Sequence, residues 1–261
     1  MQVIDHRFLQ SSIVQSVELT IFVPCFNEEK RVYGTLENIR KAIQEISYTY
    51  EIVVINDGST DRTVDEVNAF IDEHPEVEIR LYQNPRNIGL SISFVNTAFF
   101  SRGRYFMLVW GDNVMPFQSI QTLISHIGQA DMIIPYFLDV PGKNLFRMIV
   151  SKSYTCLVNF LSGYSIRYYN GGAIFLRYDV MRWAPNNSGF TGFFAELITQ
   201  LLDRGASYVE IPITCKHYEK YLKKNVIFAH QNILSTVHTL LNIFLRRLRK
   251  VLFMKLEGNV L

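Results

Sequence analysis

Short apolar segments that alternate with helix-like segments are the feature that most constrains the fold of this 261-residue chain. Residues 18–24, 50–55 and 105–110 read as strands, and apolar side chains follow each of them at helical spacing. Segment 50–55 is nearly continuous in apolar character, as in a strand covered on both faces. The repeated strand–helix unit predicts an α/β fold, Rossmann-like, around a mostly parallel central sheet with flanking helices and right-handed crossovers.

The remaining elements divide the chain into two regions. Further strands are expected at 77–82, 132–135, 173–176 and 208–213, and helices at 28–46, 90–101, 116–128, 145–161 and 193–204. Ser59 or Thr60 is expected to cap the helix that follows the second strand. We expect one α/β domain over 1–215, followed by a basic loop and an amphipathic C-terminal helix over 216–261.

Composition excludes several classes of protein. With 48% hydrophobic and 19% charged residues, the chain is not intrinsically disordered. Its three cysteines are far apart, which argues against a disulfide framework or a CxxC metal site and suits a reducing cytosol. No apolar run reaches the roughly 18 residues that a spanning helix needs, and no secretory signal begins the chain. We expect a cytoplasmic protein.

The charge is unevenly distributed. The net charge is +2, but residues 212–261 hold nine basic and two acidic side chains, a local charge of +7. From residue 226 onward, apolar side chains recur every three or four positions, with polar and basic residues opposite. Such helices lie in the membrane interface, where each basic residue adds about 1 kcal/mol near anionic lipid. We expect peripheral binding to the inner face of the membrane and no nucleic-acid partner; packing of the stripe on the domain or in a homo-oligomer is the alternative.

Ligands of parallel α/β sheets bind beyond the carboxyl ends of the strands, so three loops are candidates for a site. In the first, Phe26 can stack on a base and Glu28 can accept hydrogen bonds from it; the acids can equally complement a helix dipole. In the second, Asp57 can bind a base or a ribose, or form a turn and helix cap. In the third, Asp112 can hold Mg²⁺ or Mn²⁺ against phosphate oxygens, or belong to a metal-free turn.

The order of these motifs resembles that of a known family. Pro-x-Phe-Asn-Glu-Glu at 24–29, Asn-Asp-Gly-Ser-Thr-Asp at 56–61, Asn-Ile-Gly at 87–89 and Gly-Asp-Asn at 111–113 resemble the family 2 glycosyltransferases of the GT-A fold. The resemblance covers about residues 18–245 and is closest to the branch of dolichyl- and polyprenyl-phosphate sugar synthases. It implies an inverting transfer of a sugar from a nucleotide-diphosphate sugar to an acceptor, most simply a polyprenyl phosphate.

The resemblance assigns roles to individual residues. Pro24, Phe26, Glu28, Asp57 and Gly89 correspond to positions that bind the nucleotide sugar. Asp112 corresponds to the last Asp of the family's Asp-x-Asp, which binds a divalent cation, Mg²⁺ or Mn²⁺, on the diphosphate, and Asn113 adds a weak oxygen ligand. Trp110 stands where the first Asp would be, which puts metal affinity in doubt.

The acceptor determines whether the reaction needs a base. A phosphate is already anionic, whereas a sugar hydroxyl needs a general base, for which Glu196 is the candidate; a plain helix-surface glutamate is the alternative. Positive charge for the phosphates is expected from six basic residues: Arg147, Lys216, His217, Lys220, Lys223 and Lys224. A glycosyltransferase acting on a hydroxyl of a cell-surface glycan, or a nucleotide-sugar-binding protein without turnover, remain the competing functions.

Overall fold

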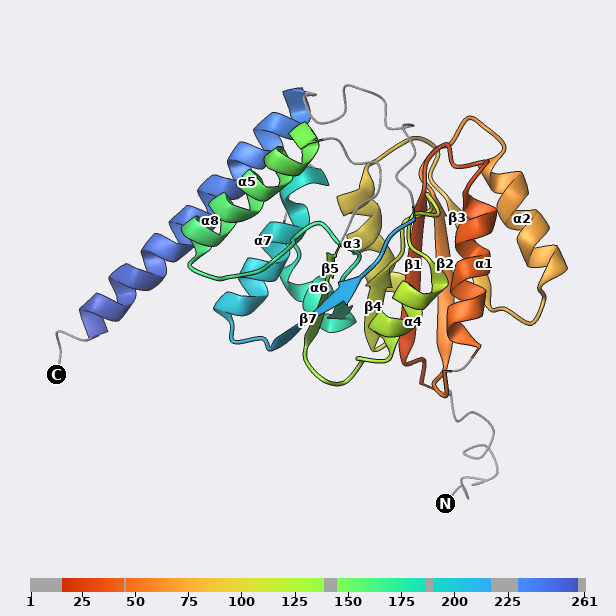
Figure 1. Ribbon diagram of the computed structural model, residues 1–261, viewed down its shortest axis with the longest axis horizontal. Coiled ribbons are helices and arrows are strands. Elements are labelled where there is room, and N and C mark those ends of the chain that lie inside the picture. The colour runs from red at the N-terminus through yellow and green to blue at the C-terminus, as the bar shows by residue number, and fades with distance from the viewer. Residues whose placement is uncertain (1–15, 45, 139–144, 186–189, 217–229, 258–261) are drawn as a thin grey trace, which may run out of the picture.

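The computed structural model describes residues 16–44, 46–138, 145–185, 190–216 and 230–257. Its centre is one seven-stranded sheet in the order β3-β2-β1-β4-β6-β5-β7 (Figure 1). The strands are β1 (Leu19–Cys25), β2 (Tyr50–Asn56), β3 (Ile79–Gln83), β4 (Tyr105–Leu108), β5 (Met132–Phe137), β6 (Ile174–Leu176) and β7 (Tyr208–Ile213). The helices are α1 (Val32–Ile43), α2 (Thr63–Glu73), α3 (Leu90–Phe100), α4 (Phe117–Ile124), α5 (Leu145–Ser162), α6 (Arg177–Trp183), α7 (Phe190–Asp203) and α8 (His230–Glu257).

The central strands are apolar on both faces because helices cover both faces of the sheet. Along β1, Ile21 and Val23 join a core with α1, α2 and α4, whereas Phe22 between them joins a core with α3, α6 and α7. Strand side chains alternate between faces, so one apolar run supplies both cores. The expected α/β fold with a mostly parallel sheet is confirmed.

Three features of the structure differ from the sequence expectations. Strand β6 runs antiparallel to both β4 and β5, between which it lies. The short helix α6 follows it directly and is absent from the sequence prediction. The expected cap on α2 is also wrong: its N-cap is Arg62, without a side-chain bond, and Ser59 Oγ instead accepts a bond from the Asn27 amide at 2.9 Å.

One buried carboxylate ties the strands together beneath the core. Glu51 on β2 is fully buried and accepts hydrogen bonds from Thr20 on β1, from Arg80 on β3 and from Arg102 after α3. Burial raises the pKa of this carboxyl, but the hydrogen bonds from Arg102 and Thr20 and the charge of Arg80 outweigh burial and lower the pKa. The network fixes the relative register of three neighbouring strands.

The C-terminal helix α8 packs on α7, and α5 lies beside it at the end of the molecule away from α1 and α2 (Figure 1). With 28 residues, α8 is roughly 42 Å long. Within the described part of the chain, none of the helices is both long and apolar enough to cross a membrane.

Candidate functional site

The loops after β1, β2 and β4 meet at the carboxyl edge of the sheet, as the sequence predicts. The Asp57 amide donates to the carbonyl of Cys25 at 2.8 Å, and the Gly111 amide donates to the carbonyl of Pro24 at 3.3 Å. The Glu28 amide donates to Thr63 Oγ1 at 2.8 Å, which joins the first loop to the start of α2. These cross-loop bonds make the edge one continuous surface.

The first loop presents an aromatic ring beside a carboxylate. Phe26 is 46% exposed, whereas Phe22, the aromatic side chain of β1, is buried. Asn27 adopts a left-handed backbone with φ of 58°, which reverses the chain between the two side chains. Glu28 pairs with Arg31, and its pKa is raised because burial outweighs the charge of Arg31. An exposed ring next to a hydrogen-bond acceptor suits a nucleobase.

Asp57 is tied to the loop that follows β3. Its Oδ1 accepts bonds from Asn84 Nδ2 at 2.7 Å and from the Ile88 amide at 3.0 Å, and its Oδ2 accepts one from the Gly89 amide at 3.0 Å. Gly89 has a φ of 91°, which few other residues adopt. Asp57 therefore shapes the start of α3, and Gly89 lies within hydrogen-bond distance of it as part of the same loop.

The third loop carries Asp112 and a lysine. Asp112 Oδ1 accepts a bond from the Val114 amide at 3.2 Å, and burial raises the pKa of this carboxyl. Asn113 has a φ of 58°, and its Oδ1 accepts bonds from Asn38 Nδ2 at 2.6 Å and from Lys216 Nζ at 2.7 Å. The Lys216 amide also donates to the Val114 carbonyl at 2.8 Å, so the residues after β7 are fastened to this loop.

This arrangement offers a divalent cation one carboxylate. Asp112 Oδ2 has no hydrogen-bond partner among the described residues, and a half-buried carboxylate with a raised pKa gains from a nearby positive charge. Asn113 Oδ1 already faces two donors, so it would have to leave both to bind a metal. No group of three or more His, Cys, Asp or Glu side chains gathers within the described ranges. A Mg²⁺ or Mn²⁺ ion fits at Asp112 when diphosphate oxygens supply the rest of its coordination.

The role of Glu196 as a general base stays a prediction, and the structure shows what this carboxylate contacts. Glu196 on α7 is 5% exposed, and both of its carboxylate oxygens face α8. Asn242 Nδ2 donates to Oε1 at 3.0 Å, Thr239 Oγ1 donates to Oε2 at 3.4 Å, and Arg246 Nη1 lies 4.0 Å from Oε1. A carboxylate bonded in this way fastens α7 to α8.

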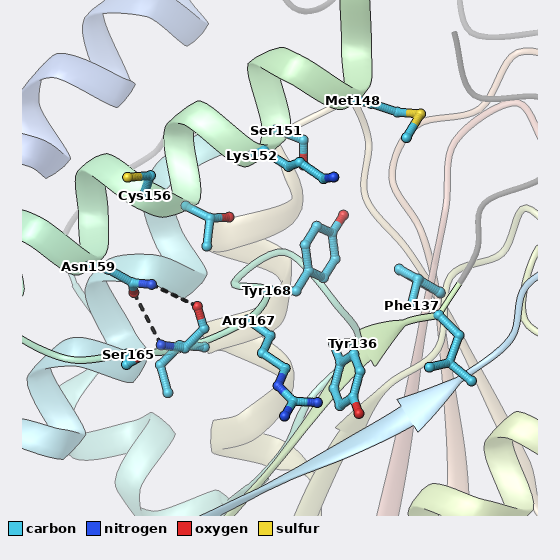
Figure 2. Close-up of a pocket in the computed structure, with 13 residues that line it drawn as sticks. Tyr136, Phe137, Met148, Ser151, Lys152, Cys156, Asn159, Ser165, Arg167 and Tyr168 are labelled. Atoms are coloured by element: carbon cyan, nitrogen blue, oxygen red, sulfur yellow. Dashed lines mark hydrogen bonds between the residues drawn. The ribbon is translucent and has the colours of Figure 1, made fainter. Parts of the chain in front are cut away.

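A cavity of about 630 Å³ opens at the carboxyl end of β5 (Figure 2). Strand β5, helix α5 and the loop before β6 supply its walls: Tyr136, Phe137, Leu138, Met148, Ser151, Lys152, Thr155, Cys156, Asn159, Ser165, Ile166, Arg167 and Tyr168. Asn159 closes one end, because its side chain bonds both the amide and the carbonyl of Ile166. The described lining contains two cationic side chains, Lys152 and Arg167, and no carboxylate.

The cationic side chains of the cavity come from separate elements. Figure 2 shows Lys152 reaching from α5 toward the ring of Tyr168, and Arg167 lying against Tyr136. The guanidinium of Arg167 is 4.5 Å from the centre of that ring. Its Nε is also 3.9 Å from Glu210, and the side chain of Arg167 is 62% exposed. Neither residue was among the sequence candidates.

The structure describes the side chain of only one of the six predicted phosphate ligands. Arg147 lies in the first turn of α5, and its side chain is outside the described residues. His217, Lys220, Lys223 and Lys224 also lie outside the described residues. Lys216 is the one member of that lysine cluster with a described position, and burial lowers its pKa.

A family model described as "Glycosyl transferase family 2" matches residues 20–185, more than half of the chain. The chain belongs to glycosyl transferase family 2. The match spans β1 to α6, so it includes the loops that carry Phe26, Asp57 and Asp112 and the whole described wall of the cavity. The family assignment agrees with the resemblance drawn from the motifs.

Curated relatives of this glycosyltransferase act on lipid phosphates according to their names. A dolichyl-phosphate beta-glucosyltransferase of Dictyostelium discoideum is 30% identical over 127 residues, which cover 46% of this chain and 39% of that protein. A dodecaprenyl-phosphate galacturonate synthase of Rhizobium johnstonii is 25% identical over 158 residues, 60% of this chain and 46% of that protein. The matches thus span less than half the length of these relatives.

Solved structures establish the GT-A fold. Glucosyl-3-phosphoglycerate synthase from Mycobacterium tuberculosis, crystallised with Mn²⁺, UDP and glucosyl-3-phosphoglycerate, superposes with a TM-score of 0.64. The superposition covers 85% of this chain and 80% of that one at 14% identity. The same protein with Mn²⁺, UDP and phosphoglyceric acid gives a TM-score of 0.66. At this identity the likeness concerns the fold.

Proposed function

We propose that this family 2 glycosyltransferase moves a sugar from a nucleotide-diphosphate sugar to a polyprenyl phosphate, with inversion at the anomeric carbon. The observation that carries the proposal is the chemistry of the cavity at the end of β5. Its described lining combines Lys152 and Arg167 with aromatic and aliphatic side chains and lacks any carboxylate. A phosphate on an apolar chain complements such a lining.

The absence of a base in this lining favours a phosphate over a hydroxyl acceptor. A sugar hydroxyl must lose its proton as it attacks, so a glycan acceptor needs a general base within hydrogen-bond reach. The sequence candidate for that base, Glu196, is buried against α8. A phosphate oxygen is already charged near neutral pH and attacks without such help. The attacking oxygen approaches the face opposite the leaving diphosphate, which inverts the anomeric configuration.

The donor lies at the neighbouring loops in this proposal. The exposed ring of Phe26 stacks on the base, and Glu28 and the Asp57 loop hold the base and ribose. Asp112 would hold a divalent cation, which would supply positive charge beside the diphosphate. Lys216, fastened beside Asp112 through Asn113, adds a fixed positive charge to the same region.

The names of the curated relatives support the acceptor class. Their printed activities concern dolichyl phosphate and dodecaprenyl phosphate, both lipid phosphates. Because such acceptors reside in bilayers, the proposal places the enzyme at a membrane surface. Assays with a panel of nucleotide sugars would identify the sugar and the nucleotide.

The test measures release of nucleoside diphosphate from a panel of UDP- and GDP-sugars with Mg²⁺ or Mn²⁺. Undecaprenyl phosphate in detergent, a neutral oligosaccharide and no acceptor are compared. We expect turnover with the lipid phosphate alone, and loss of turnover in Asp112→Ala and with EDTA. Faster turnover with the oligosaccharide would overturn the acceptor assignment.

Variants of the cavity separate the acceptor site from the donor site. We expect Lys152→Ala and Arg167→Ala each to raise the KM for the lipid phosphate about tenfold, because each removes one ionic contact to the phosphate. The KM for the donor should stay unchanged. Arg62→Ala, an exposed arginine beside α2, is the matched control and should change neither constant.

The replacement of an acid by Trp110 makes a second function worth testing, that of a nucleotide-sugar-binding protein without turnover. Donor-induced stabilisation of the fold, without diphosphate release for any acceptor, would establish that function instead.

A further inference from the structure

The orientation of α8 reverses that of an ordinary surface helix. A helix on a soluble domain normally turns its apolar stripe to the core and its polar side to water. The fully described buried residues of α8 are Ser235, Thr239 and Ile243, two of which are polar. The side that contacts α7 is therefore mainly polar.

Specific polar contacts fix this orientation. Besides the bonds from Asn242 and Thr239 to Glu196, Arg246 Nη2 donates to Thr199 Oγ1 at 2.6 Å and its Nε donates to Asp203 at 3.2 Å. Gly192 on α7 lets α8 approach closely, because a Cβ there would lie 2.0 Å from Thr239 Oγ1. Rotating α8 to bury its apolar side would break every one of these bonds.

The apolar side of α8 consequently faces outward. Seven large apolar side chains on it are more than two-fifths exposed: Leu234, Val237, Leu241, Phe244, Leu245, Leu248 and Leu252. They recur at three- and four-residue steps along one side of the helix, as a continuous stripe does. An extended exposed apolar stripe on a soluble protein marks an interaction surface.

Helix α5 exposes a second set of apolar side chains beside the first. Six are exposed: Leu145, Phe146, Met148, Ile149, Leu157 and Phe160. Phe160 is the most exposed of them, at 82%. Since α5 and α8 lie alongside each other (Figure 1), we call the two sets together the apolar platform.

Charge distinguishes the possible occupants of the apolar platform. Helices α5 and α8 contain seven basic residues and one acidic residue, Glu257. Two of the basic side chains, Arg246 and Lys250, lie within 4 Å of Asp203, whereas Arg249 and Lys152 are exposed. A second copy of the chain would bring two such positively charged faces together, and like charges there repel. An anionic bilayer offers apolar chains and negative headgroups at once.

We propose that the apolar platform of α5 and α8 docks the protein on an anionic lipid bilayer. The sequence assigns this role to the C-terminal helix alone. The structure instead turns Arg246 inward and adds α5. Met148 belongs both to the platform and to the lining of the cavity, so docking places the cavity mouth at the lipid surface. The docking step itself does not depend on the proposed transfer reaction.

The experiment measures binding of the full chain to vesicles by co-sedimentation, without donor or acceptor. Vesicles of phosphatidylcholine are compared with vesicles containing 30% phosphatidylglycerol. We expect Phe160→Glu on α5 and Leu241→Glu on α8 each to lower the partition coefficient about tenfold or more. Arg249→Gln should lower it about fivefold in anionic vesicles and not in neutral ones. Phe99→Glu, an exposed aromatic on α3, is the matched control and should bind like the wild type.

Circular dichroism and gel filtration of each variant check the fold and the oligomeric state. Unchanged binding in Phe160→Glu would exclude α5 from the docking surface and overturn the platform. A wild-type dimer that both glutamate variants dissociate, without vesicle binding, would assign the surface to a second copy. Vesicle binding is measured without sugar transfer, so a failed transfer assay would not count against the docking proposal. A failed vesicle-binding assay would likewise not count against the proposed transfer reaction.

Discussion

Replacing Glu196 with glutamine distinguishes a helix-fastening carboxylate from a catalytic base. The substitution keeps the shape of the side chain and removes its charge. In the structure the carboxylate accepts a bond from Asn242 at 3.0 Å and lies 4.0 Å from Arg246, which retains Asp203 as its partner at 3.2 Å. Hydrogen bonds to charged groups contribute about 1.5–3 kcal/mol and neutral ones about 0.5–1.5 kcal/mol. We therefore expect Glu196→Gln to lower the free energy of unfolding by about 1–2 kcal/mol.

The two roles predict very different rates. Loss of a general base typically costs a factor of about 10² to 10⁴ in turnover. If the carboxylate only fastens α8 to α7, kcat should stay within about threefold of the wild type. The assay is nucleoside diphosphate release at saturating donor with a short-chain polyprenyl phosphate in detergent, alongside urea unfolding at equilibrium. Asp203→Asn is the matched control, since it weakens the same attachment through Arg246.

A hundredfold fall in kcat for Glu196→Gln, with an unchanged unfolding midpoint and a normal Asp203→Asn, would refute this reasoning. Hydrogen exchange along α8 supplies an independent readout. Both variants should speed exchange in that helix while leaving the strands protected, because local opening follows the loss of local contacts.

Three further predictions concern the rest of the fold. Asp57→Ala leaves two backbone amides without partners and should lower the free energy of unfolding by about 2–4 kcal/mol in thermal denaturation, whereas a wild-type value would mean that water replaces the carboxylate. The pKa of Glu51 is lowered in the folded state, so the stabilisation that the charged carboxylate provides is present above the ordinary value of 4.5 and is lost as pH falls through the folded pKa. Glu51→Gln should therefore flatten the dependence of the unfolding free energy on pH below about 5. An unchanged slope would contradict this prediction. Gly192→Ala should displace α8, because the added Cβ would collide with Thr239. Hydrogen exchange should then become faster in α8 while the amides of β1 stay protected.

The donor side of the fold could be predicted because its signals are local. Segments 19–25 and 50–56 are mostly apolar, and each ends in a loop whose residue types match the family motif. Mostly parallel pairing with right-handed crossovers follows from the repeated strand–helix unit. The positions of Phe26, Asp57 and Asp112 at one edge of the sheet then follow from topology alone.

The other side could not be predicted because its decisive contacts are distant in sequence. The partners of Glu196 lie 43 and 46 residues further along the chain, and no sequence pattern in α7 predicts them. Lys152 and Arg167 meet only because α5 and the next loop fold toward β5. The periodicity of α8 indicates two faces but not which of them is buried, since that depends on the polar residues of α7.

The antiparallel strand β6 has a consequence for how the chain folds as it is synthesised. Strands β1 to β4 pair only with one another up to residue 108, so this half of the sheet can form early. Strand β5 pairs only with β6 and β7, both of which come later. The apolar segment Met132–Phe137 therefore has no pairing strand while the 36 residues between it and β6 are synthesised, and the edge of β4 stays open over the same interval. Exposed strands of this kind attract other chains, which makes this interval the period in which a nascent copy is most prone to aggregate or to need a chaperone.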